Sequence, residues 1–314
     1  MCFGLVMLDI LVSGVGKLPE HWEETVFAGK FFPSIGGGAA NSAITLGRLG
    51  AVVEIAGKTG DDSFGELINA ELCNNGVLTG NLLCQEKTPS GLAIGLVNPE
   101  GKRCFITSRG ANDTLHPGEF NFSAKKQFGV FFVNGFFQFP QAEGALLKLS
   151  KEFRQARVKI AFDMASWDAS GRWMGAVAPF VPHISCFFCN TTQLKILTGQ
   201  EDQKRGAKFL LEQGAGEVIV KMGPLGCTVY GSDQPIHTGA PDLPVVDTTG
   251  AGDSFDAAYL FALSKGWTPF ECSAFGNTVA GINCGSFGAT GGVPDYKTAL
   301  REMARYYTLP REVS

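Results

Sequence analysis

Residues 246–255 read Val-Asp-Thr-Thr-Gly-Ala-Gly-Asp-Ser-Phe, and this stretch leads from a β-rich run into a helix. Gly250 and Gly252 allow the backbone to approach a ligand closely, and the first amides of a helix that begins near Ala251 have no partner inside it. These amides and the helix dipole favour an anion such as a phosphoryl group. Asp253, in the first turn, can accept a proton from an attacking hydroxyl. The pattern indicates phosphoryl transfer; the alternative is an ordinary strand-to-helix turn.

Length and composition indicate a globular protein with a large core. The chain has 314 residues, 45% of them hydrophobic, which fits one α/β domain over residues 1–314. The net charge is −4 and the sequence pI is about 5.7. No basic block exceeds the pairs Lys125-Lys126 and Lys204-Arg205. Bulk charge therefore favours neither nucleic acid nor an acidic membrane surface as a partner.

The cysteines favour reduced thiols and a cytoplasmic location. There are nine, scattered and odd in number, in a chain able to build its own core. Cys186 and Cys189 form a lone CxxC inside an apolar run, which favours a buried strand over a metal site. The apolar opening, residues 1–15, lacks a basic start and contains Asp9, so we expect a first strand rather than a signal peptide. No stretch reaches the length of a membrane-spanning helix.

Runs rich in β-branched and aromatic residues alternate with amphipathic segments along the whole chain. This alternation favours a three-layer α/β/α domain with a mostly parallel central sheet. We predict strands at 3–8, 52–56, 130–134, 159–163, 184–188, 217–221 and 227–230. We predict helices at 39–49, 64–74, 141–157, 202–213, 251–264 and 269–284.

Two stretches break the alternation. Residues 12–32 are irregular, and residues 91–108 read as a hairpin around the turn 98–101. Active sites in open α/β sheets lie at the carboxyl edge, and phosphoryl transfer benefits from the exclusion of water. We therefore expect a small β-lid, contributed by about residues 11–34 and 90–109, over that edge.

A second glycine cluster opens a helix at residues 35–41, Ile-Gly-Gly-Gly-Ala-Ala-Asn. Bare backbone at the glycines would let a substrate rest against it, and Asn41 offers a donor and acceptors to a sugar hydroxyl. The alternative is close packing of helix against strand without a ligand. Neither a Walker A loop nor a GxGxxG motif occurs in the chain.

Three motifs together carry a resemblance to a known family. They are Gly-Gly-Gly-Ala-Ala-Asn at 36–41, Gly-Lys-Thr-Gly-Asp-Asp-Ser-Phe-Gly at 57–65 and Asp-Thr-Thr-Gly-Ala-Gly-Asp at 247–253. In order and spacing they resemble the signatures of the ribokinase/PfkB family of carbohydrate kinases over nearly the whole chain. The resemblance implies a central sheet, a β-lid that often forms a homodimer contact, MgATP as donor, and a sugar or nucleoside hydroxyl as acceptor.

The resemblance also implies roles for individual residues around the acceptor. Asp253 resembles the family's catalytic base, with Gly250, Ala251 and Gly252 as the anion hole. Asp9, at the end of the predicted first strand, resembles the acceptor of sugar hydroxyls. The further implied substrate contacts are Gly37, Gly38 and Asn41. Arg109, where the hairpin returns to the main domain, is a candidate contact to substrate or phosphate, and a solvated arginine is the alternative.

On the nucleotide side, the resemblance places one loop along ATP and one residue beside the adenine. The loop residues are Lys221, Gly223 and Gly226, and the residue beside the adenine is Asn277. Asn190 falls in the segment that organises magnesium, and the loops near Asp247, Thr249 and Gly288 lie where some relatives bind potassium through carbonyl oxygens.

One position departs from the family pattern. The magnesium segment usually reads Asn-x-x-Glu, whereas residues 190–193 read Asn-Thr-Thr-Gln. Glutamine keeps the size of glutamate and loses its charge, so it holds the water shell of a hard dication less well. The change predicts altered magnesium dependence, or a protein that binds without efficient turnover.

The leading interpretation is an ATP-dependent kinase that phosphorylates a hydroxyl of a small sugar or sugar acid, with Asp253 as general base. One alternative is a nucleoside kinase of the adenosine or inosine type, in which the Phe-rich segment 131–137 would stack on a base; a core strand and its exit is the other interpretation of that segment. The second alternative is a non-catalytic sugar or nucleotide sensor, suggested by Gln193.

Overall fold

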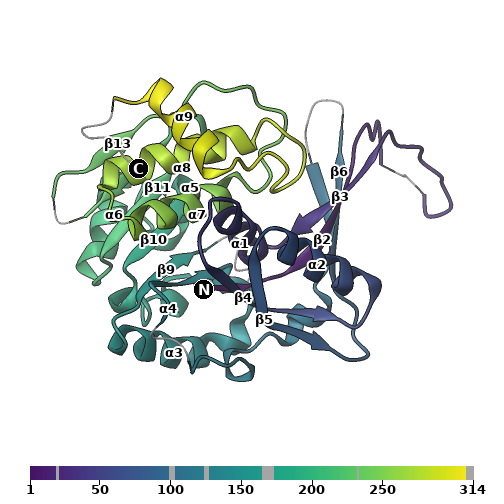
Figure 1. Cartoon of the computed structure of the whole chain (residues 1–314), viewed down its shortest axis with the longest axis horizontal. Helices are drawn as coiled ribbons and strands as arrows, with labels where there is room; N and C mark the ends of the chain where they lie inside the picture. The colour runs from purple at the N-terminus through teal and green to yellow at the C-terminus, as the bar shows by residue number, and fades with distance from the viewer. Residues whose placement is uncertain (19–20, 99–102, 124–126, 165–172, 232, 309–314) are drawn as a thin grey trace.

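The computed structural model describes residues 1–18, 21–98, 103–123, 127–164, 173–231 and 233–308. Its strands form two sheets (Figure 1). The large sheet has nine strands in the order β13-β12-β11-β10-β9-β8-β1-β4-β5, and the small sheet has four in the order β3-β2-β6-β7. Neighbours from β11 to β5 are parallel, while β12 and β13 add antiparallel pairs at one edge. A mostly parallel central sheet is therefore confirmed.

The strands of the large sheet are β1 (Cys2–Gly4), β4 (Val53–Gly60), β5 (Val77–Gln85), β8 (Val130–Asn134), β9 (Lys159–Asp163), β10 (Cys186–Asn190), β11 (Glu217–Lys221), β12 (Cys227–Tyr230) and β13 (Ile236–Thr238). Those of the small sheet are β2 (Met7–Val12), β3 (Phe31–Gly36), β6 (Gly91–Val97) and β7 (Arg103–Ser108). The α-helices are α1 (Gly38–Arg48), α2 (Ser63–Asn74), α3 (Glu143–Gln155), α4 (Trp173–Val177), α5 (Thr191–Thr198), α6 (Gln203–Glu212), α7 (Ala251–Ser264), α8 (Pro269–Asn283) and α9 (Tyr296–Tyr306).

Helices cover both faces of the large sheet. On each face, a separate hydrophobic cluster lies between the sheet and its helices. Successive strand residues point to opposite faces, so Phe187 packs in one cluster and Phe188 in the other. The first cluster takes residues from α3, α5 and α6, and the second takes residues from α1, α2, α7, α8 and α9. The α/β/α layering predicted from the alternation is confirmed.

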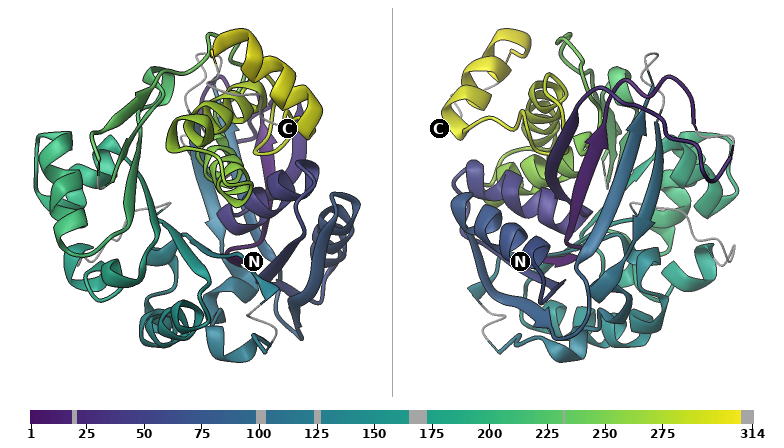
Figure 2. Two further views of the ribbon diagram at one scale, coloured as in Figure 1. Left: turned by 60° about the vertical axis from the view of Figure 1, so that its left-hand side comes forward. Right: turned by 90° about the vertical axis from the view of Figure 1, so that its right-hand side faces the viewer.

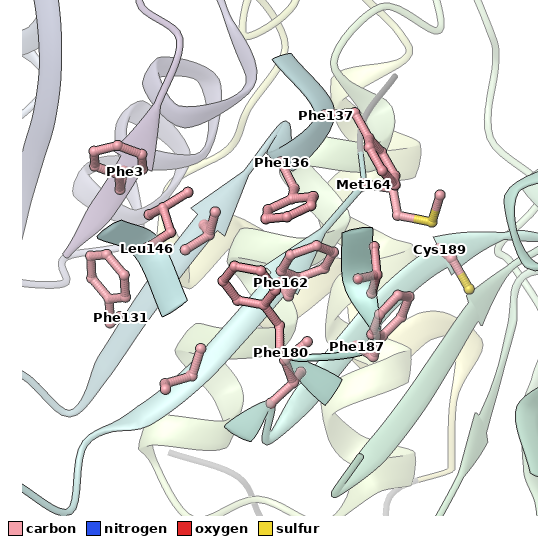
Figure 3. Close-up of a cluster of buried hydrophobic side chains, with 14 of the residues drawn as sticks. Phe3, Phe131, Phe136, Phe137, Leu146, Phe162, Met164, Phe180, Phe187 and Cys189 are labelled. Atoms are coloured by element: carbon pink, nitrogen blue, oxygen red, sulfur yellow. The ribbon is translucent and has the colours of Figure 1, made fainter. Parts of the chain in front are cut away.

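The Phe-rich segment 131–137 belongs to the core. Figure 3 shows Phe136 among Phe162 and Phe180, and the Phe136 and Phe180 ring centroids are 4.7 Å apart. The Phe131 ring stacks on Phe153 at 4.3 Å. Because these rings are buried against one another, this segment offers no free surface on which a base could stack.

The predicted first strand, 3–8, is wrong as a single element. The chain leaves the large sheet after Gly4 and enters the small sheet at Met7, so the run is divided between β1 and β2. Both pieces are buried, and no polar residue marks the break. Asp9 consequently lies in the middle of β2 rather than at the end of the first strand of the large sheet.

The small sheet uses the segments predicted for a lid, although its first strand begins at Met7 rather than near residue 11. It stands to the right of the large sheet in Figure 1, and the right-hand view of Figure 2 faces it. The predicted hairpin is confirmed as the antiparallel pair β6–β7. Its turn, 98–101, falls mostly outside the described residues. Closure of this sheet over a site stays a prediction.

Candidate phosphoryl-transfer site

The start of α7 is built on a glycine that no other residue replaces without strain. Gly250 caps the helix at φ 71°, in the left-handed region, and a Cβ there would overlap the carbonyl of Ala289. Gly252 has more room, since a Cβ on it would lie 3.4 Å from Lys221 Nζ. The turn therefore presents backbone amides at the helix N-terminus, as an anion site requires.

Asp253, in the first turn of α7, is held by two amide side chains from distant segments. Asn41 Nδ2 of α1 donates to Asp253 Oδ2 at 2.8 Å, and Asn134 Nδ2 at the end of β8 donates to Oδ1 at 3.0 Å. Burial raises the pKa of Asp253 to about 6, and nearby Asp163 adds to this, while the two amide hydrogen bonds oppose it. The carboxylate is thereby oriented and has a pKa near that of a neutral-pH base.

The Asp9 carboxylate lies near Asp253. Burial and then the charge of Asp253 raise the pKa of Asp9 to about 6. No group among the described residues donates a hydrogen bond to the Asp9 carboxylate. A Cβ on Gly36 would overlap this carboxylate, so the glycine makes room for it. Its oxygens can accept hydrogen bonds from a ligand with hydroxyl groups.

The glycine cluster serves close packing around Asn134. Gly37 has φ 86°, and a Cβ on Gly38 would overlap Asn134 Oδ1. The Oδ1 atoms of Asn41 and Asn134 are buried and have no hydrogen-bond partner in the described part of the chain, and neither has Ser34 Oγ on β3. Ser34 pairs in register with Asp9. Several buried oxygens thus gather around the two carboxylates.

The nucleotide-side residues have other partners in this structure. Lys221 Nζ binds the carboxylates of Asp163 and Asp256 at 2.7 and 2.8 Å. Asn277 Nδ2 donates to the carbonyls of Thr238 and Gly239. Gly223 and Gly226 shape the turn after β11 with φ of 58° and 84°.

Asn190 and Gln193 cap α5. The Gln193 amide donates to Asn190 Oδ1 at 2.8 Å, and the Asn190 amide donates to Gln193 Oε1 at 2.7 Å. Both side chains therefore serve as a reciprocal capping box.

Asp247 and Arg109 also have protein partners. Asp247 Oδ1 accepts from the Thr249 amide and hydroxyl, and Oδ2 accepts from the Gly288 amide at 3.0 Å. Arg109 Nη1 donates to the Gln138 carbonyl at 2.5 Å. Asp247 thus joins the turn before α7 to the loop after α8.

No described group of three or more His, Cys, Asp or Glu side chains could hold a metal ion. Mg²⁺ usually binds through one or two carboxylates together with substrate phosphates and water, so this finding does not bear on magnesium that would enter with ATP. Gly223 and Gly252 leave room for a phosphate group to approach, because a Cβ on Gly223 would meet nothing within 4 Å and one on Gly252 would meet only Lys221 Nζ, at 3.4 Å.

Sequence reasoning missed Asn134, Asp163 and Asp256 as site residues. Asn134 and Asp163 are register partners at the carboxyl ends of the adjacent parallel strands β8 and β9. Polar residues at neighbouring strand ends are a signal for a site in this fold. Asp256 follows Asp253 by three residues, a spacing that places both on one helix face.

Fold and site together define the ribokinase-like class of α/β proteins. The family model of the pfkB family carbohydrate kinases matches residues 1–295. The chain therefore belongs to the pfkB family of carbohydrate kinases.

Relatives agree with this assignment. The ribokinase of Mus musculus is 31% identical over 83% of this chain and 80% of its own length. Fructokinase-2 of Solanum lycopersicum is 27% identical over 96% of this chain and 94% of its own. A solved structure of Arabidopsis thaliana ribokinase with ribose and ATP superposes with a TM-score of 0.86 at 25% identity, and covers 96% of this chain and 97% of that one.

Proposed function

We propose that this carbohydrate kinase transfers the γ-phosphoryl group of ATP to a hydroxyl of a small sugar, with Asp253 as general base. The observation that carries the proposal is the Asp253 carboxylate, which Asn41 and Asn134 hold beside the glycine-lined start of α7. ATP as donor is supported by the relative that was solved with ATP.

In the proposed reaction, Asp253 takes the proton of the acceptor hydroxyl. The hydroxyl oxygen then forms the new bond to phosphorus as the bond to the departing ADP breaks, and the amides of residues 250–252 stabilise the charge on the transferred group. Magnesium, where bound, would neutralise phosphate charge. Exclusion of water by the small sheet would limit loss of the phosphoryl group to hydrolysis.

The residues around the proposed acceptor position favour a neutral sugar over a sugar acid as the substrate. Asp9 and Asp253 are both acidic, and the charge of Asp253 adds to the burial that raises the pKa of Asp9. A ligand carboxylate would add a third negative charge, since Lys221 and Arg109 are bonded to protein groups. Sugar hydroxyls can donate to Asp9 and to the unpartnered oxygens of Ser34, Asn41 and Asn134.

An ATP-consumption assay over neutral sugars, sugar acids and nucleosides tests the proposal. We expect turnover with a neutral sugar in the wild type and a loss of about 1,000-fold or more in Asp253→Ala. Equal activity of the two proteins would exclude Asp253 as the base. Ligand-induced thermal stabilisation without any phosphorylated product would favour the non-catalytic sensor instead.

Three further expectations belong to this proposal. Potassium would bind through carbonyls of the loops that Asp247 joins, and comparison of activity in K⁺ and Na⁺ tests this. A homodimer would form through the small sheet, which sedimentation or light scattering tests. A cytoplasmic location is consistent with nine free cysteines. No helix among the described residues is long and apolar enough to cross a membrane.

A further inference from the structure

Lys221, the last residue of β11, is fully engaged by two buried carboxylates. Its Nζ donates to Asp163 Oδ2 at 2.7 Å and to Asp256 Oδ1 and Oδ2 at 2.9 and 2.8 Å. An ammonium group has three N–H donors, and three carboxylate oxygens surround this one. The side chains of Asp163 and Asp256 are 4% and 0% exposed. The cluster therefore joins the ends of β9 and β11 to α7.

This three-residue cluster lies directly behind the glycine-lined turn. A Cβ placed on Gly252 would lie 3.4 Å from Lys221 Nζ. Asp256 stands one helical turn beyond Asp253 on the same face of α7. The ammonium group therefore lies close to Gly252, with room for little more than a methyl group between them, and so close to the proposed phosphoryl cradle, the backbone of residues 250–252.

The net charge of Lys221, Asp163 and Asp256 affects how well an anionic ligand can bind at the start of α7. Two carboxylates without a cation would be costly to bury, and the negative potential that they keep would oppose a phosphoryl group bound at the start of α7. Burial lowers the pKa of Lys221, but Asp163 and Asp256 together raise it well above its ordinary value, so the ammonium group stays charged. Lys221 therefore offsets part of the negative potential that would otherwise reach the cradle.

We propose that Lys221 is a positioning residue that acts as the internal counter-ion of the phosphoryl cradle, held there by Asp163 and Asp256. The resemblance to the family implied a different role, a direct contact with ATP. In the proposed role, Lys221 offsets the negative charge of the two carboxylates and, through Asp256, ties α7 to the sheet. The catalytic consequence rests on the proposed kinase function.

Three variants separate the two roles: Lys221→Met, Asp256→Asn, and the double variant that carries both changes. As a counter-ion, Lys221→Met lowers kcat about 100-fold while the KM of the acceptor changes less than about 3-fold. The double variant removes one charge of each sign, which restores the net charge of the wild-type cluster, and it regains at least about 10-fold of that loss. A double variant no more active than Lys221→Met would overturn the proposal.

The pH profile distinguishes this role from a purely structural one. Lys221 lowers the pKa of Asp253, so Lys221→Met moves the acid limb of kcat/KM to higher pH. An acid limb at the same pH in Lys221→Met and the wild type would contradict the counter-ion role of Lys221. Lys221→Met changes none of the other groups around Asp253, and only the variants that carry Asp256→Asn change one of them. These groups are Asp9 from β2, Asn41 from α1, Asn134 from β8, Asp163 from β9 and Asp256 from α7.

Nucleotide binding and thermal unfolding give readouts that do not need turnover. If Lys221 held ATP directly, calorimetry with ADP and ATP would show weaker binding of both in Lys221→Met, with no recovery in the double variant, and the proposal would fail. We expect unchanged ADP affinity and a double variant with a higher Tm than Lys221→Met. If the wild type phosphorylates no acceptor, the kinase proposal fails. Nucleotide affinity and Tm would still test whether Lys221 serves as the counter-ion of Asp163 and Asp256. Should Lys221→Met not fold, Asp256→Asn and the double variant carry the comparison.

Discussion

At the scale of single residues, the site depends on two carboxylates that burial makes hard to ionise. The pKa values of Asp9 and Asp253 are both raised to about 6, first by burial. A general base works best when its pKa lies near the operating pH. The same burial that tunes Asp253 for proton transfer makes its ionised form unfavourable for the folded state.

Asp253→Asn should therefore stabilise the protein at neutral pH while it abolishes turnover. The pKa of Asp253 is higher in the folded protein than in the unfolded chain, so its contribution to stability is fully present below about pH 4 and is lost as pH rises through about 6. Asparagine has no charge to bury, and one of the Asn41 and Asn134 amides can turn to present its free oxygen. We expect a gain of about 1–2 kcal/mol in the free energy of unfolding at pH 7.5.

Urea unfolding of the wild type and Asp253→Asn at pH 5 and pH 7.5 checks this. The advantage of the variant should shrink at pH 5, where the wild-type carboxyl is largely protonated. A variant that is equally destabilised at both pH values would show that the carboxylate hydrogen bonds outweigh its burial.

Gly250 and Gly252 should respond differently to the same added methyl group. Gly250 has φ 71° and no room beside the Ala289 carbonyl, whereas a Cβ on Gly252 meets only ordinary contact with Lys221 Nζ. Gly250→Ala should lose about 1–3 kcal/mol of stability together with activity. Gly252→Ala is the matched control and should fold with a Tm close to that of the wild type. Thermal unfolding of the two variants measures the difference, and equal Tm values would contradict the strained turn.

At the scale of elements, the sequence predicted best those strands and helices whose own residues show a clear strand or helix pattern. The strands at 130–134, 159–163 and 217–221 and the helix at 251–264 agree with the structure residue for residue. The strand β5 went unpredicted because Gly80 and Asn81 interrupt its apolar pattern. The short helix α5 and the terminal α9 were missed as well.

The candidate site was only partly predictable because its geometry comes from pairing between distant segments. The glycines and Asp253 lie in local motifs that a single stretch displays. Asn134 ends β8, which lies beside β1 in the large sheet, and the tertiary fold brings it within hydrogen-bond distance of Asp253, 119 residues away in the chain. The division of residues 3–8 between two sheets, which places Asp9 on β2, is likewise a property of strand pairing.

The capping box of α5 gives a prediction about the departure from the family pattern. Gln193 fills the box without a charge, and glutamate at that position would keep the hydrogen bonds and add a negative charge at the helix N-terminus. Gln193→Glu should raise stability by about 0.3–1 kcal/mol at low salt. Gln193→Ala, which loses the box, is the control and should be less stable than the wild type.

Activity of Gln193→Glu over a magnesium titration then separates the two interpretations of this position. A lower magnesium requirement, with measurable wild-type turnover, indicates that glutamine tunes the metal dependence. Absence of turnover in both proteins favours the sensor. A variant less stable than the wild type would contradict the capping role.

At the scale of the whole molecule, the small sheet contacts the loop at residues 287–289, which packs against Gly250 at the start of α7. Phe32 of β3 stacks on Phe287, with ring centroids 5.1 Å apart and planes within 10°. Ser34, two residues on, would lie 3.3 Å from a Cβ on Gly288. The Gly288 amide donates to Asp247, and the next carbonyl, that of Ala289, packs against Gly250. A contact made by the small sheet is thus continuous with the start of α7.

Loss of the Phe32–Phe287 stack should weaken acceptor binding more than it weakens the fold. An aromatic pair contributes about 0.5–1.5 kcal/mol beyond its buried area, which corresponds to a rise of about 2- to 10-fold in the acceptor KM of Phe287→Ala. Phe287 is 47% exposed, so its truncation leaves no core cavity. Leu78→Ala on β5, at 54% exposure, truncates a comparably exposed residue and is the control. Steady-state kinetics, with hydrogen exchange of residues 31–36, measures both effects. An unchanged KM with faster exchange in β3 would show that the stack supports the small sheet without contributing to substrate binding.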